Sequence, residues 1–197
     1  MDLLDLVTLT PLMSRTSGRS EIMIGLLDSP VAVLHPDLAG ANLRKIPGRR
    51  GGTSVQASSA ACLHGTFIAG ILCAKRGSPA PAICPDCTLL VRPIFIETTL
   101  TSGQAPSATP DTLAAAIVET IEAGARVLNL SVALAQPSMR GERALEEALD
   151  YAVSRGVIPV AAVGNQGTLG STAITRHRVV PAPEPLLDAP TLLCPHY

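Results

Sequence analysis

Aromatic residues are almost absent from this chain of 197 residues, which contains two Phe, two Tyr and no Trp. Proteins that hold single-stranded nucleic acid usually stack the bases on aromatic side chains. Nucleic-acid binders also usually carry a basic excess, whereas this chain has 15 Lys and Arg against 16 Asp and Glu, a formal net charge of −1. Both observations argue against a nucleic-acid partner, and they leave Val, Ile, Leu and Ala to build the core.

Charged residues are also scarce, because they make up 16% of the chain against about 25% in a typical globular protein. Apolar residues make up 47%, which excludes an intrinsically disordered chain. No apolar run approaches the ~18 residues of a membrane span, so we expect no contact with a membrane. The length suits one domain of ordinary size.

The cysteines do not form the pattern of a secreted disulfide framework, because their number, five, is odd. Asp2 and Asp5 also stand where a signal peptide carries positive charge, so we expect a cytoplasmic protein. Cys84 and Cys87 form a single CxxC motif, without the second ligand pair that structural zinc requires. We predict two cysteines in a turn before a strand, with no metal and no cofactor.

Four short apolar runs indicate buried strands, and they span residues 22–27, 88–95, 126–132 and 157–163. Each run is rich in Leu or β-branched residues and is apolar on both faces, which is typical of a parallel sheet covered on both sides. Helical patterns lie between the runs. We therefore predict an α/β fold, a parallel sheet flanked by helices.

Two helices are predicted with defined ends. Thr109 is a good N-cap before Pro110, and Gly124 is a stop signal; a second helix spans residues 142–155 and ends at Gly156. The expected buried positions recur every four residues: Leu113, Ile117, Ile121, and then Leu145, Leu149, Val153.

Three segments read as loops, covering residues 44–52, 77–85 and 98–110, because they are rich in Gly, Pro, Ser, Thr or basic residues. The first contains four basic residues, which we interpret as a solvated loop and not as an anion site: Arg44, Lys45, Arg49 and Arg50. From Pro181 to Tyr197 there are five prolines in 17 residues, so the sheet cannot continue there.

Polar residues stand at the ends of the predicted strands, where open α/β sheets gather catalytic groups. Asp28 ends the first strand, Asn165 follows the fourth, and His64 begins a predicted helix. A carboxylate can orient an imidazole, the imidazole can take a proton from a nucleophile, and an amide can stabilise an oxyanion. Each residue also has a structural interpretation, as a helix cap, a buried histidine or a turn residue. Gly65 could leave room for a substrate backbone beside His64.

Four segments of the chain resemble motifs of the subtilisin-like serine proteases, and they occur in the order of that family. The aspartate motif corresponds to residues 26–38 (LLDSPVAVLHPDL), the histidine motif to 64–70 (HGTFIAG), the substrate-cleft strand to 127–131 (VLNLS), and the oxyanion segment to 160–167 (VAAVGNQG). The resemblance covers roughly residues 20–175. Residues 3–18, 87–95 and 164–177 are most similar to the branch that matures cyanobactin-type peptides.

This resemblance implies a serine endopeptidase site. Asp28 would orient His64, the ring of His64 would act as general base and then general acid, and Asn165 would donate to the oxyanion. The cleft strand would bind the backbone of a peptide or protein substrate by β-augmentation, through Ser131, Val132 and Ala133. Two residues depart from the family. Pro30 stands where most members have Gly and would stiffen the turn after Asp28, and Ala133 stands where many members have Gly and could narrow the primary specificity pocket.

The nucleophile is the largest departure from the family. No Gly-Thr-Ser-Met-Ala-like run follows Asn165. Ser171 comes too soon after Asn165, and Ser54 follows Gly-Gly-Thr but precedes His64 in the chain, and short matches of this kind arise by coincidence. We therefore predict that the chain alone is inactive or nearly so, since loss of the serine alone costs a subtilisin about 10⁶ in turnover.

The family resemblance suggests three regions: a leading segment (1–20), a partial, C-terminally incomplete peptidase domain (21–177) and a Pro-rich tail (178–197), which we interpret as the product of a frameshift or truncation near His177. An incomplete sheet exposes apolar surface and a strand edge, so we expect self-association or a complementing chain. Two alternatives remain: a non-catalytic peptide-binding module that keeps the protease fold, and a nucleotide-binding domain using residues 164–170, a loop without the phosphate-binding fingerprints.

Overall fold

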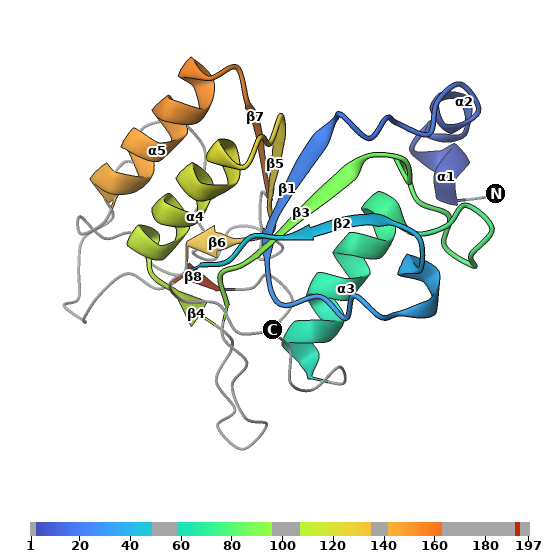
Figure 1. The fold of residues 1–197 in the computed structure, drawn as a ribbon, viewed down its shortest axis with the longest axis horizontal. Coiled ribbons are helices and arrows are strands. Elements are labelled where there is room, and N and C mark those ends of the chain that lie inside the picture. The colour runs from blue at the N-terminus through green and yellow to red at the C-terminus, as the bar shows by residue number, and fades with distance from the viewer. Residues whose placement is uncertain (1–2, 49–58, 96–106, 135–141, 163–191, 194–197) are drawn as a thin grey trace.

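The computed structural model describes residues 3–48, 59–95, 107–134, 142–162 and 192–193. At its centre is a parallel sheet of five strands in the order β2-β3-β1-β5-β7 (Figure 1). The strands are β1 (Met23–Asp28), β2 (Asn42–Lys45), β3 (Thr88–Pro93), β5 (Val127–Leu130) and β7 (Ile158–Ala161). The α/β sheet flanked by helices is thus confirmed.

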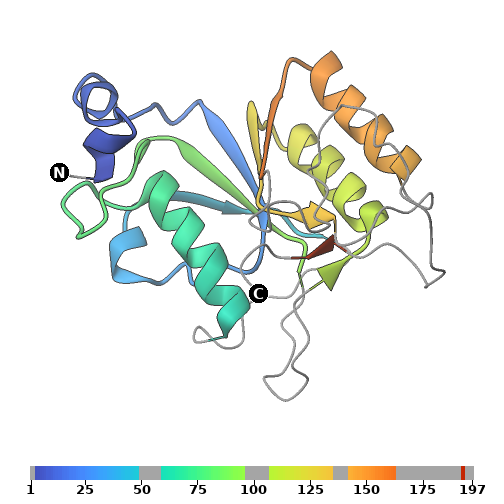
Figure 2. The ribbon, with the colours of Figure 1, turned by 180° about the vertical axis from the view of Figure 1, so that it is seen from behind.

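Helices cover the two faces of this sheet unequally. The helices α4 (Pro110–Glu122) and α5 (Glu142–Ser154) lie on one side, and α3 (Ala60–Cys73) lies on the other (Figures 1 and 2). We call the side under α4 and α5 the closed face and the side under α3 the open face.

Short elements complete the described chain. They are the helices α1 (Leu3–Leu6) and α2 (Thr10–Met13), the 3₁₀-helix η1 (Pro36–Leu38), and the two-residue strands β4 (Ser107–Ala108), β6 (Ala133–Leu134) and β8 (Leu192–Leu193). The three short strands form a second sheet in the order β4-β8-β6, in which β8 runs antiparallel to both neighbours.

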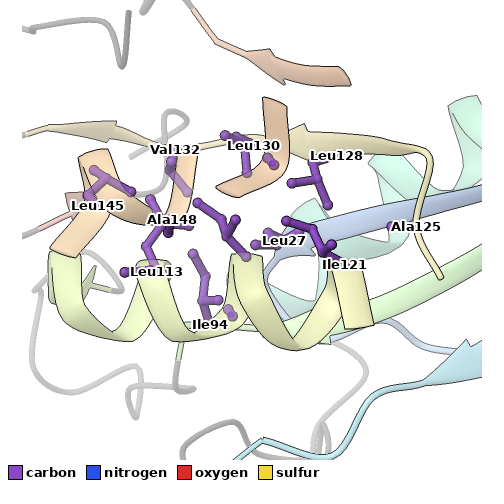
Figure 3. Close-up of a cluster of buried hydrophobic side chains, with 14 of the residues drawn as sticks. Leu27, Ile94, Leu113, Ile121, Ala125, Leu128, Leu130, Val132, Leu145 and Ala148 are labelled. Atoms are coloured by element: carbon purple, nitrogen blue, oxygen red, sulfur yellow. The ribbon is translucent and has the colours of Figure 1, made fainter. Parts of the chain in front are cut away.

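The closed face holds the larger apolar core, part of which is shown in Figure 3. Leu27, Leu128 and Leu130 point from the sheet toward Leu113 of α4 and Leu145 of α5, and all five are buried. Burying a Leu side chain stabilises the fold by about 1.5–3 kcal/mol, so this core is the main source of stability on that face.

Close packing of α4 on the sheet depends on Gly25 in β1. A Cβ atom at Gly25 would lie 2.3 Å from Cγ2 of Thr120 and 2.9 Å from Cδ2 of Leu128. Such distances are well inside van der Waals contact, so a glycine is needed where α4 crosses β1.

Most helix and strand predictions are confirmed. Thr109 caps α4 by accepting a hydrogen bond from the backbone N–H of Thr112 (3.2 Å). Gly124 and Gly156, with φ of 102° and 68°, follow the ends of α4 and α5, in the left-handed region that favours glycine.

Other predictions are wrong. Arg44 and Lys45, expected in a loop, lie in strand β2, whose exposed edge position removes the apolar signal of a strand. Ser107 and Ala108, also expected in a loop, form β4. Val153, expected on the buried side of α5, is 48% exposed, because the helix instead buries the series Leu145, Ala148 and Ala152.

Strand β7 differs most from its prediction, which was burial on both faces. Ile158 and Val160 are 61% and 51% exposed. The backbone N–H of Ile158 donates to the carbonyl of Arg126, just before β5, and the N–H of Ala162 donates to the carbonyl of Leu130 in β5. Successive residues of a strand alternate in direction, so the nitrogen of Pro159 points away from β5. Proline has no N–H to donate at that outer edge.

No helix in the described part of the chain is long and apolar enough to cross a membrane.

Candidate active site

Strand β1 delivers Asp28 to the carboxyl end of the sheet. The side chain is fully buried, and its Oδ1 accepts hydrogen bonds from the backbone N–H of Ser29 (2.5 Å) and from Nδ1 of His64 (2.7 Å). A buried carboxylate is costly unless it is paired and hydrogen-bonded. These contacts meet that requirement at Oδ1, and they give Asp28 a fixed orientation.

His64 lies in the second turn of α3, close to the helix N-terminus. Ser59 is the N-cap, and its hydroxyl accepts from the backbone N–H of Cys62 (3.1 Å). This cap fixes where the helix begins and therefore which residue points toward β1. The side chain of His64 points inward and is nearly as buried as Asp28.

Gly65 and Thr66 attach α3 to the loop that follows β1. The hydroxyl of Thr66 accepts from the backbone N–H of Ala32 (2.8 Å). A Cβ atom at Gly65 would lie 2.5 Å from the carbonyl oxygens of both Ser29 and Pro30. The glycine therefore makes room for the chain's own backbone, where the sequence suggested room for a substrate.

The hydrogen bond to an ionised Asp28 selects which ring nitrogen of His64 carries a proton. An ionised carboxylate can only accept hydrogen bonds, so Nδ1 of His64 carries the proton that it donates to Oδ1. In the neutral ring, Nε2 is then the basic nitrogen. The pair can therefore accept a proton at Nε2 while the carboxylate stabilises the resulting imidazolium.

The residues predicted for substrate binding follow β5 at the same end of the sheet. Ser131 and Val132 are buried, and the hydroxyl of Ser131 accepts from the side-chain amide of Asn129 (2.7 Å). Ala133 pairs with Leu193 in the small antiparallel sheet. Sequence reasoning missed Asn129, although its position two residues before Ser131 on a strand places both on one face.

Asn165 lies outside the described residues, as do Ser54 and Ser171. The chain reaches the correct end of the sheet before Asn165, because the backbone N–H of Ala162 donates to the carbonyl of Leu130 (3.1 Å). The proposed oxyanion role of Asn165 therefore stays a prediction.

Arg92 is a buried charge that the sequence analysis did not identify. Its Nε donates to Oε2 of Glu119 on α4 (2.7 Å), and its Nη1 donates to the carbonyl of Pro93 (2.5 Å). Pro93 stands opposite Asp28 in the strand register. The ion pair therefore supports the end of β3 beside Asp28, from the closed face.

The CxxC cysteines occupy a turn before β3, as predicted, with the backbone N–H of Cys87 donating to the carbonyl of Cys84 (3.1 Å). Burial and then the neighbouring Cys87 raise the pKa of Cys84 to about 12, and the same two causes raise the pKa of Cys73 to about 11. Thiols with raised pKa values are poor nucleophiles and metal ligands at neutral pH. Within the described residues no group of three or more His, Cys, Asp or Glu could hold a metal ion.

Comparison with known proteins gives a consistent result. The sequence model of the subtilase family matches residues 19–184. Fervidolysin from Fervidobacterium pennivorans is 29% identical over 171 residues, which are 82% of this chain and 23% of that protein.

Solved structures similar to this chain include two proteases of peptide maturation. The prenylagaramide maturation protease PagA is 28% identical, with a TM-score of 0.68 over 84% of this chain and 53% of that one. A mutant of the protease domain of PatA is 28% identical, with a TM-score of 0.70 over 82% of this chain and 56% of that one. The chain thus spans about half the length of these solved proteins.

Proposed function

The chain belongs to the subtilase family, and we propose that Asp28 and His64 are the acid–base pair of a serine endopeptidase site. The observation that carries this proposal is the 2.7 Å hydrogen bond between Oδ1 of Asp28 and Nδ1 of His64, in a buried setting at the end of the sheet. The substrate is a peptide or a protein.

In this proposal His64 moves the proton and Asp28 holds the ring. Nε2 of His64 takes the proton of a nucleophilic hydroxyl as that oxygen attacks the scissile carbonyl, and later gives the proton to the leaving amine. Asn165 donates to the oxyanion that forms. Asp28 keeps the proton on Nδ1 and stabilises the imidazolium.

We further propose that this chain is inactive by itself, because its sequence contains no serine in the motif that the family uses as nucleophile. The test is incubation of the highly purified chain with fluorogenic peptides, beside its His64→Ala variant. We expect both preparations to give the same background rate. Cleavage that disappears with His64→Ala would show that the chain supplies its own nucleophile.

A second function, binding of extended peptides without cleavage, is favoured by the position of β8. This two-residue segment lies between β4 and β6 and pairs antiparallel with both. β6 contains Ala133, one of the residues proposed to bind substrate. A peptide inserted there would gain main-chain hydrogen bonds on both sides, which is β-augmentation.

Truncation before β8 tests this function. We expect a fluorescent peptide with the sequence of residues 187–197 to bind a chain ending at residue 186, and to bind the full chain at least tenfold more weakly, because the chain's own β8 competes. The His64→Ala change should leave both affinities unchanged, since pairing involves only the backbone. If the truncated chain does not bind the peptide, the binding function is excluded, and the acid–base proposal is unaffected.

A further inference from the structure

Arg92 of β3 is a charged side chain inside the closed face, and it is only 2% exposed. Leu90, two residues earlier in the same strand, belongs to the closed-face core, and alternate residues of a strand share a face. An arginine stays charged inside a protein. Apolar residues of similar volume often stabilise a fold as well as a buried ion pair does, or better. Stability alone therefore does not account for Arg92.

The guanidinium of Arg92 joins three parts of the closed face. Its Nε donates to Oε2 of Glu119 on α4 (2.7 Å), and its Nη1 donates to the carbonyl of Pro93 at the end of β3 (2.5 Å). A Cβ atom at Gly48, in the segment after β2, would lie only 2.0 Å from Cζ of Arg92, so the guanidinium packs directly on that backbone. The rigid fork of an arginine holds both hydrogen bonds at once, whereas a lysine has a single nitrogen.

One peptide group connects this fork to the candidate site. The carbonyl of Pro93 accepts from Arg92, and the N–H of the next residue, Ile94, donates to the backbone carbonyl of Asp28 (2.8 Å). A peptide group is planar, so a bond that fixes its oxygen also fixes the direction of its N–H. Arg92 therefore acts on the backbone of Asp28 through a single rigid group.

The carboxylate of Asp28 depends on the position of its own backbone. Its Oδ1 accepts from Nδ1 of His64 and from the backbone N–H of Ser29, and the side chain is fully buried. Catalytic groups need alignment to within about 0.5 Å of the productive geometry. A small displacement of the Asp28 backbone would lengthen one of these two hydrogen bonds.

We propose that Arg92 is a positioning residue, which holds the carboxylate of Asp28 in place for His64 through the Pro93–Ile94 peptide group. This role rests on the acid–base function proposed above. It gives the closed face a part in the chemistry of the opposite face of the sheet. The neighbours of the fork then have defined tasks, because Glu119 orients it and Gly48 leaves space for it.

Amide hydrogen exchange of the full chain, measured residue by residue by NMR, tests this role. Arg92→Lys keeps the charge and can still pair with Glu119, but it loses the bond to Pro93. We expect exchange at least about tenfold faster at Ile94 and Ser29, because a charge-assisted hydrogen bond at this end of the sheet is lost.

The reference amide belongs to Arg126, which donates to the carbonyl of Met23 at the opposite end of β1 (2.8 Å). Its exchange should change by less than about threefold, since the expected loosening is local. A purely structural loss would accelerate all three amides alike, because global unfolding exposes every amide. Equal acceleration at Arg126, Ile94 and Ser29 would therefore overturn the proposal, and so would unchanged exchange at Ile94 and Ser29.

Gly48→Ala displaces the guanidinium without removing a charge, because the added methyl group would overlap it. This variant should reproduce the pattern of Arg92→Lys, and it keeps the test decisive if the Arg92 variant does not fold. Gly77→Ala is the matched control, since no atom lies within 4 Å of a Cβ atom there, and it should leave the exchange of Ile94 and Ser29 unchanged. The proposal would be rejected if Gly48→Ala behaved like Gly77→Ala.

Failure of the proposed function has a separate signature. The proton that Nδ1 of His64 donates to Asp28 should give a low-field NMR resonance in the wild type, and Arg92→Lys should broaden it through faster exchange with water. A wild-type chain without this resonance would count against the acid–base pair. The amide exchange of Ile94 and Ser29 would still decide whether Arg92 holds Asp28.

Discussion

The two faces of the central sheet are built by different rules. On the closed face, α4 and α5 bury apolar stripes against the sheet and turn polar residues outward. On the open face, a single uncharged helix carries His64 and leaves large apolar side chains in contact with solvent. The comparison shows that the face with the candidate chemistry is the less completely covered one, whereas the opposite face holds the larger core.

The exposed residues of α5 and α3 show this difference in the sequence itself. Helix α5 directs four charged residues to solvent, two of which form an i, i+4 ion pair: Arg143, Glu146, Glu147 and Asp150. Helix α3 directs Leu63 and Phe67 to solvent. An amphipathic helix buries its whole apolar side when it packs on a sheet. A helix that is apolar on most sides keeps apolar side chains exposed unless a second element packs on it.

The largest expected effect is a difference in the free energy of unfolding between two matched Leu→Ala substitutions, one on each face of the sheet. Leu113→Ala on the closed face removes a fully buried side chain and should lower the free energy of unfolding by about 2–5 kcal/mol. Leu63→Ala on the open face should change it by less than about 0.5 kcal/mol. Urea denaturation of both variants in dilute solution measures the difference, and equal losses would show that the two faces are equally packed.

An intermediate effect is expected from two glycines of α3. Gly65→Ala should destabilise the protein by about 1–3 kcal/mol, because its methyl group would contact two carbonyl oxygens of the loop after β1. Gly70→Ala should stabilise it by about 0.5–1 kcal/mol, because no atom lies within 4 Å of the added Cβ. Thermal unfolding of the two variants checks the sign, and a stabilising Gly65→Ala would mean that α3 does not lie close to that loop.

The smallest effect is the pH dependence contributed by two cysteines of the open face, Cys73 and Cys84. Their pKa values, raised from 9.0 to about 11 and about 12, keep both thiols protonated in the folded state while the unfolded chain ionises. The stability that these two thiols contribute is therefore fully present below pH 9, and it declines as the pH rises from about 9 toward 11.

We expect Cys84→Ala to reduce this decline by an amount on the order of 1 kcal/mol, allowing for screening at a half-buried thiol. Urea denaturation at pH 8 and pH 10 provides the measurement, with the wild type as reference because lysines and tyrosines titrate in both proteins. Identical slopes in the two proteins would contradict a raised pKa at Cys84.

Much of the fold was predictable because the buried strands and the capped helix α4 carry local signals. The apolar runs before Asp28 and after Cys87 mark β1 and β3, and Thr109 marks the start of α4. Strand β2 was not predictable, since an exposed edge strand needs no apolar run. The exposure of β7 was not predictable either, because its sequence looks like a buried strand and only its neighbours decide whether it is covered.

The candidate site was predictable in its residues but not in its supports. Asp28 and His64 were identified from their positions at element ends and from the family motifs, and they do form a hydrogen bond. The support of the β3 end by Arg92 and Glu119 was not predictable, because it depends on which helix crosses which strand. Gly65 was noticed, but its actual neighbours come from the tertiary docking of α3.

The edges of the sheet limit how copies of this chain can join. At one edge β2 presents Arg44 and Lys45 to solvent, and at the other Pro159 withholds a donor from the outer side of β7. Charged and proline-containing edges resist the addition of further strands. Concentrated preparations should therefore form soluble oligomers and not thioflavin-positive fibrils. Any turbidity on storage would then come from contacts between apolar faces, and it should reverse on dilution.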